Sequence, residues 1–247
     1  MSAPQTIEGA GVPLAVTVRG DGPALVIVHG AASDAQAWAP AAEELAAAGH
    51  RVVTYDRRGY GASGAPEPYG ATTVEEQAED LVAVLDGLAL DDAVLVGDGF
   101  GALVVLDVMK RHGRRVRAAV LGDPPLFAFA PAAAEALSEE RSALEADIRQ
   151  DGPQLAVERR LGPGADPEAV ARARASHRAF FADFAGLATW PVTRGELRAL
   201  AQPAVVVSRP GAPSHVVQAA DALAGLLPTA RREAGGDLVA AARGASS

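Results

Sequence analysis

Cysteine is absent from the 247 residues of this chain. A chain without cysteine can form no disulfide framework, cannot bind zinc through thiolates and has no thiol redox chemistry. The chain is thus indifferent to the redox compartment, and a reducing cytoplasm fits best. We also expect no metal ion and no other cofactor.

Long apolar runs are also missing. The first residues, "MSAPQTIEGAG", contain neither the basic nor the apolar part of an export signal, and no run approaches the roughly 18 apolar residues that cross a bilayer. Basic side chains are in deficit, with 22 Lys and Arg against 31 Asp and Glu, and an acidic surface repels phosphate backbones. We expect no binding to membranes or nucleic acid.

The pattern that is present is an alternation of short apolar runs and longer helical stretches, which is typical of a mostly parallel sheet flanked by helices. Strands are predicted at Val12–Val18, Ala24–Val28, Arg51–Tyr55, Ala93–Val96, Ala118–Gly122, Ala204–Ser208 and Arg231–Glu233. Helices are predicted at Ala37–Ala48, Val74–Leu88, Phe100–Arg111, Ala132–Gln150, Pro167–Ala185 and Val216–Leu227, with a short last helix from Asp237.

One long interval interrupts this alternation. Residues 124–202 contain only helical stretches separated by "DGP", "GPGADP" and "ATWP". An insert between two strands of an open parallel sheet usually covers the carboxyl ends of the strands, where such sheets bind ligands. We expect a core domain made of residues 1–123 and 203–247, and a helical lid made of residues 124–202.

Three motifs occur in one order along the chain. "VIVHGAASDAQAW" begins at Val26, "YDRRGYGAS" begins at Tyr55, and "VGDGFGA" begins at Val96. Together they resemble the α/β-hydrolase family, in which the first motif supplies half of an oxyanion hole and the third is the turn that carries the nucleophile. The resemblance covers nearly the whole chain and implies an α/β-hydrolase fold with a helical lid insertion.

The same resemblance implies a nucleophile, an acid and a histidine in that chain order. Gly99 stands where the nucleophile is expected, Gly211 in the loop of the acid and Gly236 at the turn of the histidine. The chain therefore resembles a non-hydrolytic variant that lacks the Ser-Asp-His triad. The backbone N–H groups of Ala31 and Phe100 would still form an oxyanion hole, although an inherited backbone geometry without any role explains them equally well.

Three side chains are candidates for proton transfer. Asp98 immediately precedes the vacant position, Asp123 follows the next strand, and His177 lies one turn from two phenylalanines of the lid. A carboxylate under an apolar lid has a raised pKa, which suits an acid or a base. Asp98 also fits a structural role behind the turn, Asp123 a cap before two prolines, and His177 an exposed position.

A hydrophobic small molecule is the expected ligand. The residues predicted to contact it are Ser33, Leu126, Phe127, Phe181 and Trp190. Apolar side chains of the lid also serve to hold it on the core, so both roles remain open.

Three functions are compatible with these features. The first is a non-hydrolytic cyclase, isomerase or lyase acting on a carbonyl-rich, polyketide-like molecule by folding it and stabilising an oxyanion; the Ala, Gly and Arg bias suits a bacterial natural-product enzyme. The second is a hydrolase relative that only binds a small ligand. The third is a hydrolase with a displaced nucleophile such as Ser33, Ser208 or Ser214. We favour the first, in a monomer or homodimer.

Overall fold

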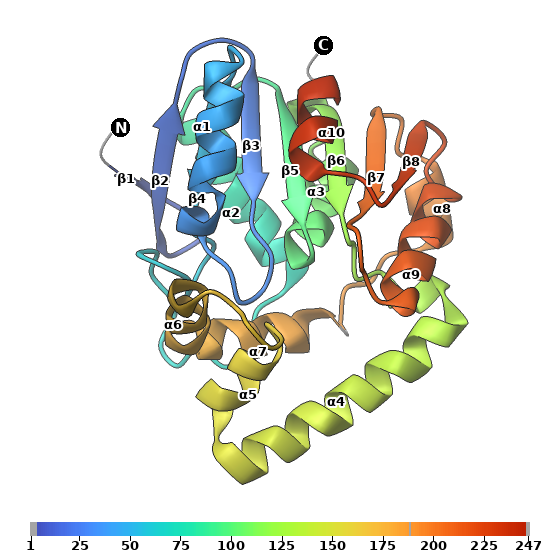
Figure 1. The fold of residues 1–247 in the computed structure, drawn as a ribbon. Helices are drawn as coiled ribbons and strands as arrows, with labels where there is room; N and C mark the ends of the chain where they lie inside the picture. Colours follow the sequence, from blue (N-terminus) through green and yellow to red (C-terminus); the bar gives the residue numbers. More distant parts are fainter. Residues whose placement is uncertain (1–3, 188, 246–247) are drawn as a thin grey trace.

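The computed structural model describes residues 4–187 and 189–245, and its centre is an eight-stranded sheet (Figure 1). The strand order is β1-β2-β4-β3-β5-β6-β7-β8. Only β2 pairs antiparallel with its neighbours, β1 and β4, and the other neighbours pair in parallel. The bounds are β1 Gln5–Glu8, β2 Pro13–Arg19, β3 Ala24–Val28, β4 Arg51–Tyr55, β5 Ala93–Asp98, β6 Val116–Gly122, β7 Ala204–Ser208 and β8 Ala230–Ala234.

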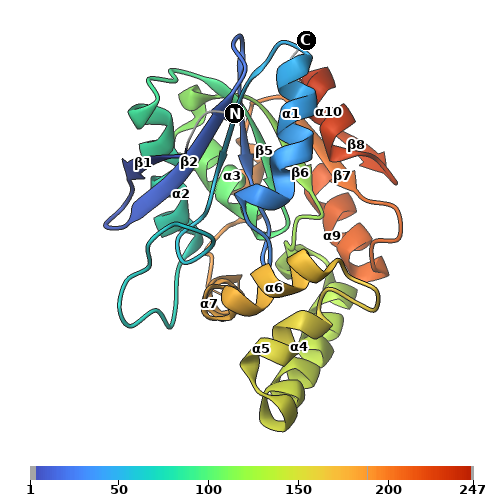
Figure 2. The same cartoon turned by 60° about the vertical axis from the view of Figure 1, so that its left-hand side comes forward.

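Helices cover both faces of this sheet (Figures 1 and 2). Helices α1 (Ala39–Ala47) and α10 (Leu238–Ala245) pack on one face, and α2 (Val74–Gly87), α3 (Phe100–Arg111) and α9 (Ser214–Ala224) pack on the other. Successive residues of a strand point to opposite faces. In β5, Leu95 accordingly belongs to the core under α2 and α3, and Val96 to the core under α1 and α10. The predicted fold class is confirmed.

A group of helices, of which α4 has 21 residues and the others are shorter, lies between β6 and β7 in the chain. In Figure 1 the arrowheads of β3 and β5 point toward α6 and α7, and α4 runs beside them. The bounds are η3 Phe127–Phe129, α4 Pro131–Asp151, α5 Pro153–Arg159, α6 Pro167–Ala175, α7 His177–Leu187 and α8 Arg194–Arg198. These elements occupy the interval that the sequence assigns to a lid, and we use that word for them below.

The structure departs from the predicted elements in the lid, where α5 and α8 were not predicted, and at the edge of the sheet. The helix predicted at Pro167–Ala185 is two helices, α6 and α7, which meet at Ser176. Its hydroxyl donates to the carbonyl of Arg172 (2.8 Å), which competes with the backbone for that acceptor. The strand β1 was not predicted. No helix in the described part of the chain combines the length and the apolar character needed to cross a membrane.

Candidate active site

The turn between β5 and α3 has the strained conformation that places a residue at its tip. Gly99, at the tip, has φ +52° and ψ −120°. A Cβ added at Gly97 would lie 2.5 Å from Ala102 Cα, and one added at Gly101 would lie 2.2 Å from the carbonyl oxygen of Val28. These two glycines are therefore required by close backbone packing. A Cβ at Gly99 would meet only Gly30 Cα, at 3.7 Å, so the space in front of this residue is open.

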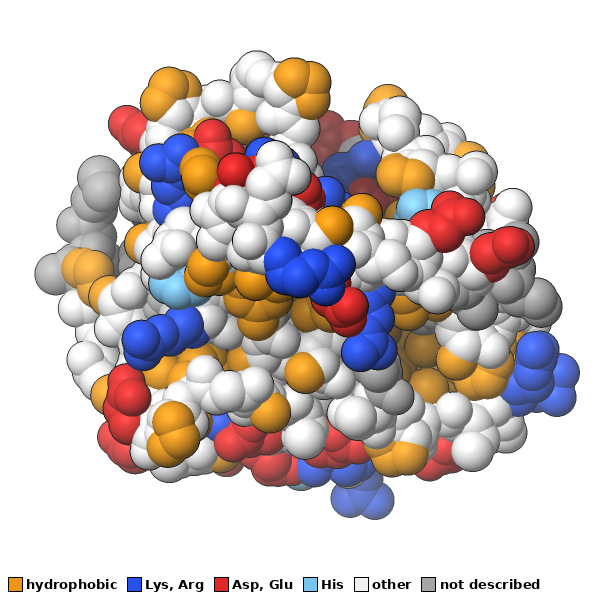
Figure 3. Space-filling model, turned by 90° about the horizontal axis from the view of Figure 1, so that it is seen from below, with side chains coloured by type: hydrophobic (Ala, Val, Ile, Leu, Met, Phe, Trp, Pro, Cys, Tyr) orange, Lys and Arg blue, Asp and Glu red, His pale blue; other side chains and the backbone are white. Residues whose placement is uncertain are grey.

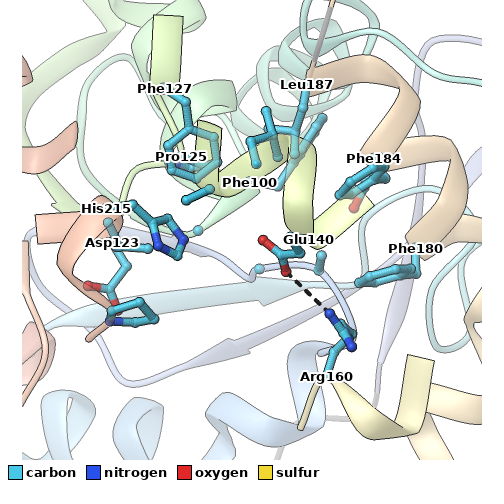
Figure 4. Close-up of a pocket in the computed structure, with 18 of the residues that line it drawn as sticks. Phe100, Asp123, Pro125, Phe127, Glu140, Arg160, Phe180, Phe184, Leu187 and His215 are labelled. Carbon is cyan, nitrogen blue, oxygen red and sulfur yellow. Dashed lines mark ion pairs between the residues drawn. The ribbon is translucent and has the colours of Figure 1, made fainter. Parts of the chain in front are cut away.

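A cavity of about 720 Å³ opens at this tip, below the carboxyl ends of the central strands (Figure 4). Its lining comes from the core and from the lid. Figure 4 shows His215 and Asp123 on one side and Phe180 and Phe184 on the other. None of the described residues that line it carries a hydroxyl or a thiol: they are Gly30, Ala31, Asp98, Gly99, Phe100, Asp123, Pro125, Phe127, Ala136, Leu137, Glu139, Glu140, Ala143, Arg160, Phe180, Asp183, Phe184, Leu187, Arg209, Pro213, His215 and Val216.

Several backbone N–H groups at this cavity have no hydrogen bond to another described residue, and two of them are the groups that the sequence predicts as an oxyanion hole. These two belong to Ala31, in the loop after β3, and to Phe100, the first residue of α3. The N–H groups of the first turn of a helix have no partner inside the helix, and the positive end of the helix dipole lies there. Both groups are available to a ligand oxygen.

Two carboxylates share one arginine at the floor of the cavity. Arg209, which follows β7, places its guanidinium 3.0 Å from Asp98 Oδ1, and its Nε donates to Asp123 Oδ2 (2.5 Å). The backbone N–H of Arg209 also donates to Asp123 Oδ1 (3.1 Å). Two of the predicted proton carriers are thus brought together, by a residue that the sequence analysis did not single out.

The protonation of Asp98 is shifted by this environment. Burial raises the pKa of Asp98 above its usual range, and Arg209 opposes the rise while Asp123 adds to it. Asp98 is only 8% exposed, so desolvation of its charged form is the larger effect. A carboxylate with a raised pKa is a stronger base than an ordinary one when it is ionised.

Asp123 has a backbone that few residues adopt. Its φ is +42°, in the left-handed region, and its N–H donates to the carbonyl of Val207 (2.9 Å). Aspartate tolerates this region better than most residues that carry a Cβ. The strained turn directs the carboxylate to Arg209 and ties the end of β6 to the end of β7.

The remaining predicted site residues lie at different places. Phe127 lines the cavity, and the centroid of its ring lies 5.6 Å from the centroid of the His215 ring. Leu126 and Trp190 belong to the core under α2 and α3, where the indole Nε1 donates to Asp107 (3.1 Å). Neither lines the cavity.

Ser33, Phe181 and His177 also lie outside the lining of the cavity. Phe181 lines a separate hollow between α4 and α7. The Nδ1 of His177 lies 2.9 Å from the carbonyl oxygen of Arg174, one turn earlier in the chain, so this ring packs back on the lid rather than on the cavity.

The three positions at which the sequence resemblance expects a triad are not equivalent in space. Gly211, between β7 and α9, has φ +79°, and a Cβ there would meet no atom within 4 Å. Gly236, after β8, is crowded, because its Cβ would lie 3.1 Å from both Val207 and Glu233. Gly99 and Gly211 have space for a side chain but a positive φ that strains any residue with a Cβ, whereas at Gly236 both Val207 and Glu233 would have to shift by a few tenths of an ångström.

A buried ion pair fastens the lid beside the cavity. Arg57, on the loop after β4, donates from Nη2 to Asp183 Oδ2 of α7 (2.7 Å), and both side chains are 1% exposed. Tyr60 and Gln77 donate to the same carboxylate. The motif "YDRRGYG" contains Arg57 and Tyr60, but nothing in its spacing identifies Asp183, which is 126 residues away, as their partner.

His29 belongs to the support of this site. Its Nε2 accepts a hydrogen bond from the N–H of Arg57 (2.9 Å), and its Nδ1 lies 2.8 Å from the carbonyl oxygen of Gly30. Burial, with the charge of Arg57 adding to it, lowers the pKa of His29 well below its usual range. The ring therefore stays neutral and holds the loop that carries Ala31.

The model of the alpha/beta hydrolase fold family matches residues 23–157, and the chain belongs to this family. It is 37% identical over 131 residues to epoxide hydrolase A of Mycobacterium tuberculosis, over 51% of this chain and 41% of that protein. It is 38% identical over 112 residues to a putative carbamate hydrolase of Variovorax paradoxus, over 44% of this chain and 42% of that protein. The matched segments thus span about two fifths of the length of these curated relatives.

Solved structures match over most of the chain. An alpha/beta hydrolase from Sphaerobacter thermophilus is 27% identical with a TM-score of 0.73, and the match covers 93% of this chain and 91% of that one. An esterase from Rhodococcus is 25% identical with a TM-score of 0.72, covering 95% and 91%. These names correct the preferred prediction from the sequence. A non-hydrolytic cyclase, isomerase or lyase is wrong, because the relatives are named hydrolases.

Proposed function

We propose that the protein is a hydrolase of small, uncharged carbonyl compounds of the ester or lactone type, in which water rather than a side chain attacks the carbonyl carbon. The relatives, which are named hydrolases, support the class of reaction. One observation carries the choice of nucleophile: the described lining of the cavity contains no hydroxyl or thiol, and the tip of the turn is Gly99 with open space before it. The vacancy of the three triad positions is part of this proposal.

The carbonyl oxygen of the substrate would accept hydrogen bonds from the N–H groups of Ala31 and Phe100. Donors that already point at the place where negative charge develops stabilise the transition state without reorganisation. Removing one such donor from an enzyme typically costs about 100- to 1000-fold in rate. The space in front of Gly99 would hold the water.

Asp98 is the base that this arrangement favours. It adjoins Gly99, it lines the cavity, and burial raises its pKa. As the oxygen of water bonds to the carbonyl carbon, Asp98 would take one proton. The carbonyl electrons move to the oxygen held by the two N–H groups and return when the bond to the alkoxide breaks, and the alkoxide takes the proton from Asp98. Arg209 and Asp123 would position the carboxylate.

Release of p-nitrophenolate from p-nitrophenyl acetate tests this proposal. We expect the wild-type protein to exceed the buffer rate, and Asp98→Asn to lose about 100-fold or more, the size of a general-base contribution. Asp92→Asn is the matched control, because Asp92 pairs with Arg117 on the surface, and we expect it to keep the wild-type rate.

Two results contradict the proposal. A wild-type rate equal to that of buffer, for esters and lactones alike, leaves a protein that binds without turnover. A stable covalent adduct, seen by intact mass after a fluorophosphonate probe or after quenching with substrate, identifies a side-chain nucleophile such as Ser33, Ser208 or Ser214.

A further inference from the structure

A second hollow lies next to the cavity, between α4 and α7. It has a volume of about 410 Å³ and shares three lining side chains with the cavity: Leu137, Phe184 and Leu187. We call it the α4–α7 groove. These three apolar side chains therefore form a common wall, with the cavity on one side and the groove on the other.

The chemistry of the groove is apolar and without net charge. Leu144, Ile148 and Phe181 line it beyond the shared residues. Its only charged lining residues in the described part of the chain, Arg141 and Glu145, pair with each other (3.1 Å). Figure 3, which looks at the molecule from the side of the lid, shows hydrophobic side chains in the hollows of this face.

The chemistry of the cavity is different, because its floor holds Asp98, Asp123 and Arg209. A ligand that fits both spaces has a polar, uncharged head and an apolar tail. We propose that the α4–α7 groove is a subsite for an unbranched alkyl tail, whose carbonyl head lies in the cavity; this inference rests on the proposed function.

The side chains that separate the two spaces can admit such a tail. Leu137, Phe184 and Leu187 are all only partly buried, and Leu137 and Leu187 are flexible side chains on two different helices. Moving side chains of this kind needs rotamer changes and no change of the backbone. The tail would then cover apolar surface of the lid that otherwise faces solvent.

Binding of ketones separates this inference from the proposed function, because a ketone has a carbonyl group and cannot be hydrolysed. We would titrate the protein calorimetrically with the series from 2-butanone to 2-nonanone. Burial of each methylene in an apolar groove predicts about 4-fold tighter binding per added carbon. We expect this gain to continue through the longer members.

Ala185→Trp blocks the groove. Ala185 is exposed on α7 and lines the groove but not the cavity. We expect the variant to bind 2-butanone as the wild type does and to lose the gain for the longer ketones. Ala240→Trp, at an exposed position of α10, is the matched control and keeps the whole gain.

Four results overturn the inference. If short ketones bind but affinity does not grow with length, or if Ala185→Trp leaves the gain intact, the tail does not lie in the groove and the proposed function is unaffected. If no ketone binds, the proposed function and the inference fail together. A concentration-dependent dimer in sedimentation that Ala185→Trp abolishes assigns the groove to a second copy of the chain.

Discussion

Asp98 combines burial, a shared arginine and a place beside the open tip of the turn. Its raised pKa also links it to stability. A carboxyl group whose pKa is higher in the folded protein than in the unfolded chain contributes stability at low pH, and this contribution is lost as pH rises through the folded pKa. At neutral pH the ionised Asp98 therefore costs stability.

Asp98→Asn removes this cost. We expect the variant to have a higher Tm than the wild type at pH 8, and the difference to shrink as pH falls and the wild-type carboxyl group becomes protonated. Thermal unfolding followed by circular dichroism between pH 4 and pH 8 measures it. A difference that grows toward low pH contradicts the assignment of the raised pKa. The same variant loses activity under the proposed function, so stability and rate move in opposite directions.

Adding a side chain is expected to be tolerated at Gly99 but not at Gly101. Gly99→Ser places its Cβ in open space but keeps φ +52°, which costs a residue with a Cβ about 1–3 kcal/mol. We expect a folded protein with a Tm lower by several degrees. Gly101→Ala places a Cβ 2.2 Å from a carbonyl oxygen, and we expect it to yield little folded protein. Soluble yield and Tm of the two variants check this, and equal behaviour contradicts the geometry of the turn.

At the scale of single residues, the sequence identified the turn but not its surroundings. Gly97, Gly99 and Gly101 were predictable because a motif of three glycines in five residues has few structural explanations. Arg209 was not, because the pairing of Asp98 with Arg209 joins residues 111 positions apart. The partners of Arg209 depend on the order of the strands in the sheet. Side-chain contacts between distant segments leave no periodic signal in the sequence.

At the scale of elements, α7 is the part of the lid that is fastened to the core. The pair between Arg57 and Asp183 is buried, and the hydrogen bonds from Tyr60 and Gln77 satisfy the carboxylate. Breaking a buried pair by removing one partner typically costs about 3–5 kcal/mol, because the other charge remains buried. Among the described residues, α6 and α8 also make ion pairs with the core, Arg172 with Asp34 and Glu196 with Lys110, but these pairs are less buried.

Asp183→Asn is expected to lower the free energy of unfolding by several kcal/mol and to loosen α7 from the loop after β4. Denaturant unfolding measures the first effect, and faster hydrogen exchange across α7 than across β5 measures the second. Arg117→Gln, which breaks the exposed pair with Asp92, is the matched control, with an expected loss below about 1 kcal/mol. Equal losses in the two variants contradict the anchoring role.

Most strands were predictable, because their apolar runs are short and bounded by glycine or charged residues. The bounds of β3, β4 and β7 agree with the structure. The strand β1 was missed because "QTIE" is polar and lies at the edge of the sheet. The run from Pro167 to Ala185 keeps a helical period across Ser176, so the sequence alone gave no reason to divide it.

At the scale of the whole molecule, charge selects among ligands. The chain carries a net charge of −9. Asp183, in the lining of the cavity, is neutralised by Arg57. The other charged residues of the lining are four carboxylates and two arginines: Asp98, Asp123, Glu139, Glu140, Arg160 and Arg209. Figure 4 shows Glu140 paired with Arg160 in the lid part of the lining (3.8 Å). The balance in the cavity remains negative.

An anionic ester is therefore expected to be a poorer substrate than a neutral one of similar size. We expect kcat/KM for p-nitrophenyl hemisuccinate to fall below that for p-nitrophenyl butyrate, and the ratio to approach one as salt rises from about 0.01 M to 1 M, where the Debye length shortens from about 30 Å to about 3 Å. Initial rates at the two salt concentrations measure this. If the preference for the neutral ester does not change with salt, the shape of the cavity rather than its charge explains the selectivity.

The crowding at Gly236 has a consequence for protein engineering. A serine at position 99 or an acid at position 211 has space but a positive φ, whereas a histidine at position 236 requires both Val207 and Glu233 to give way. A variant that carries a serine, an acid and a histidine at these three positions is therefore expected to give more soluble protein when Val207 or Glu233 is changed with them, and soluble yield measures this.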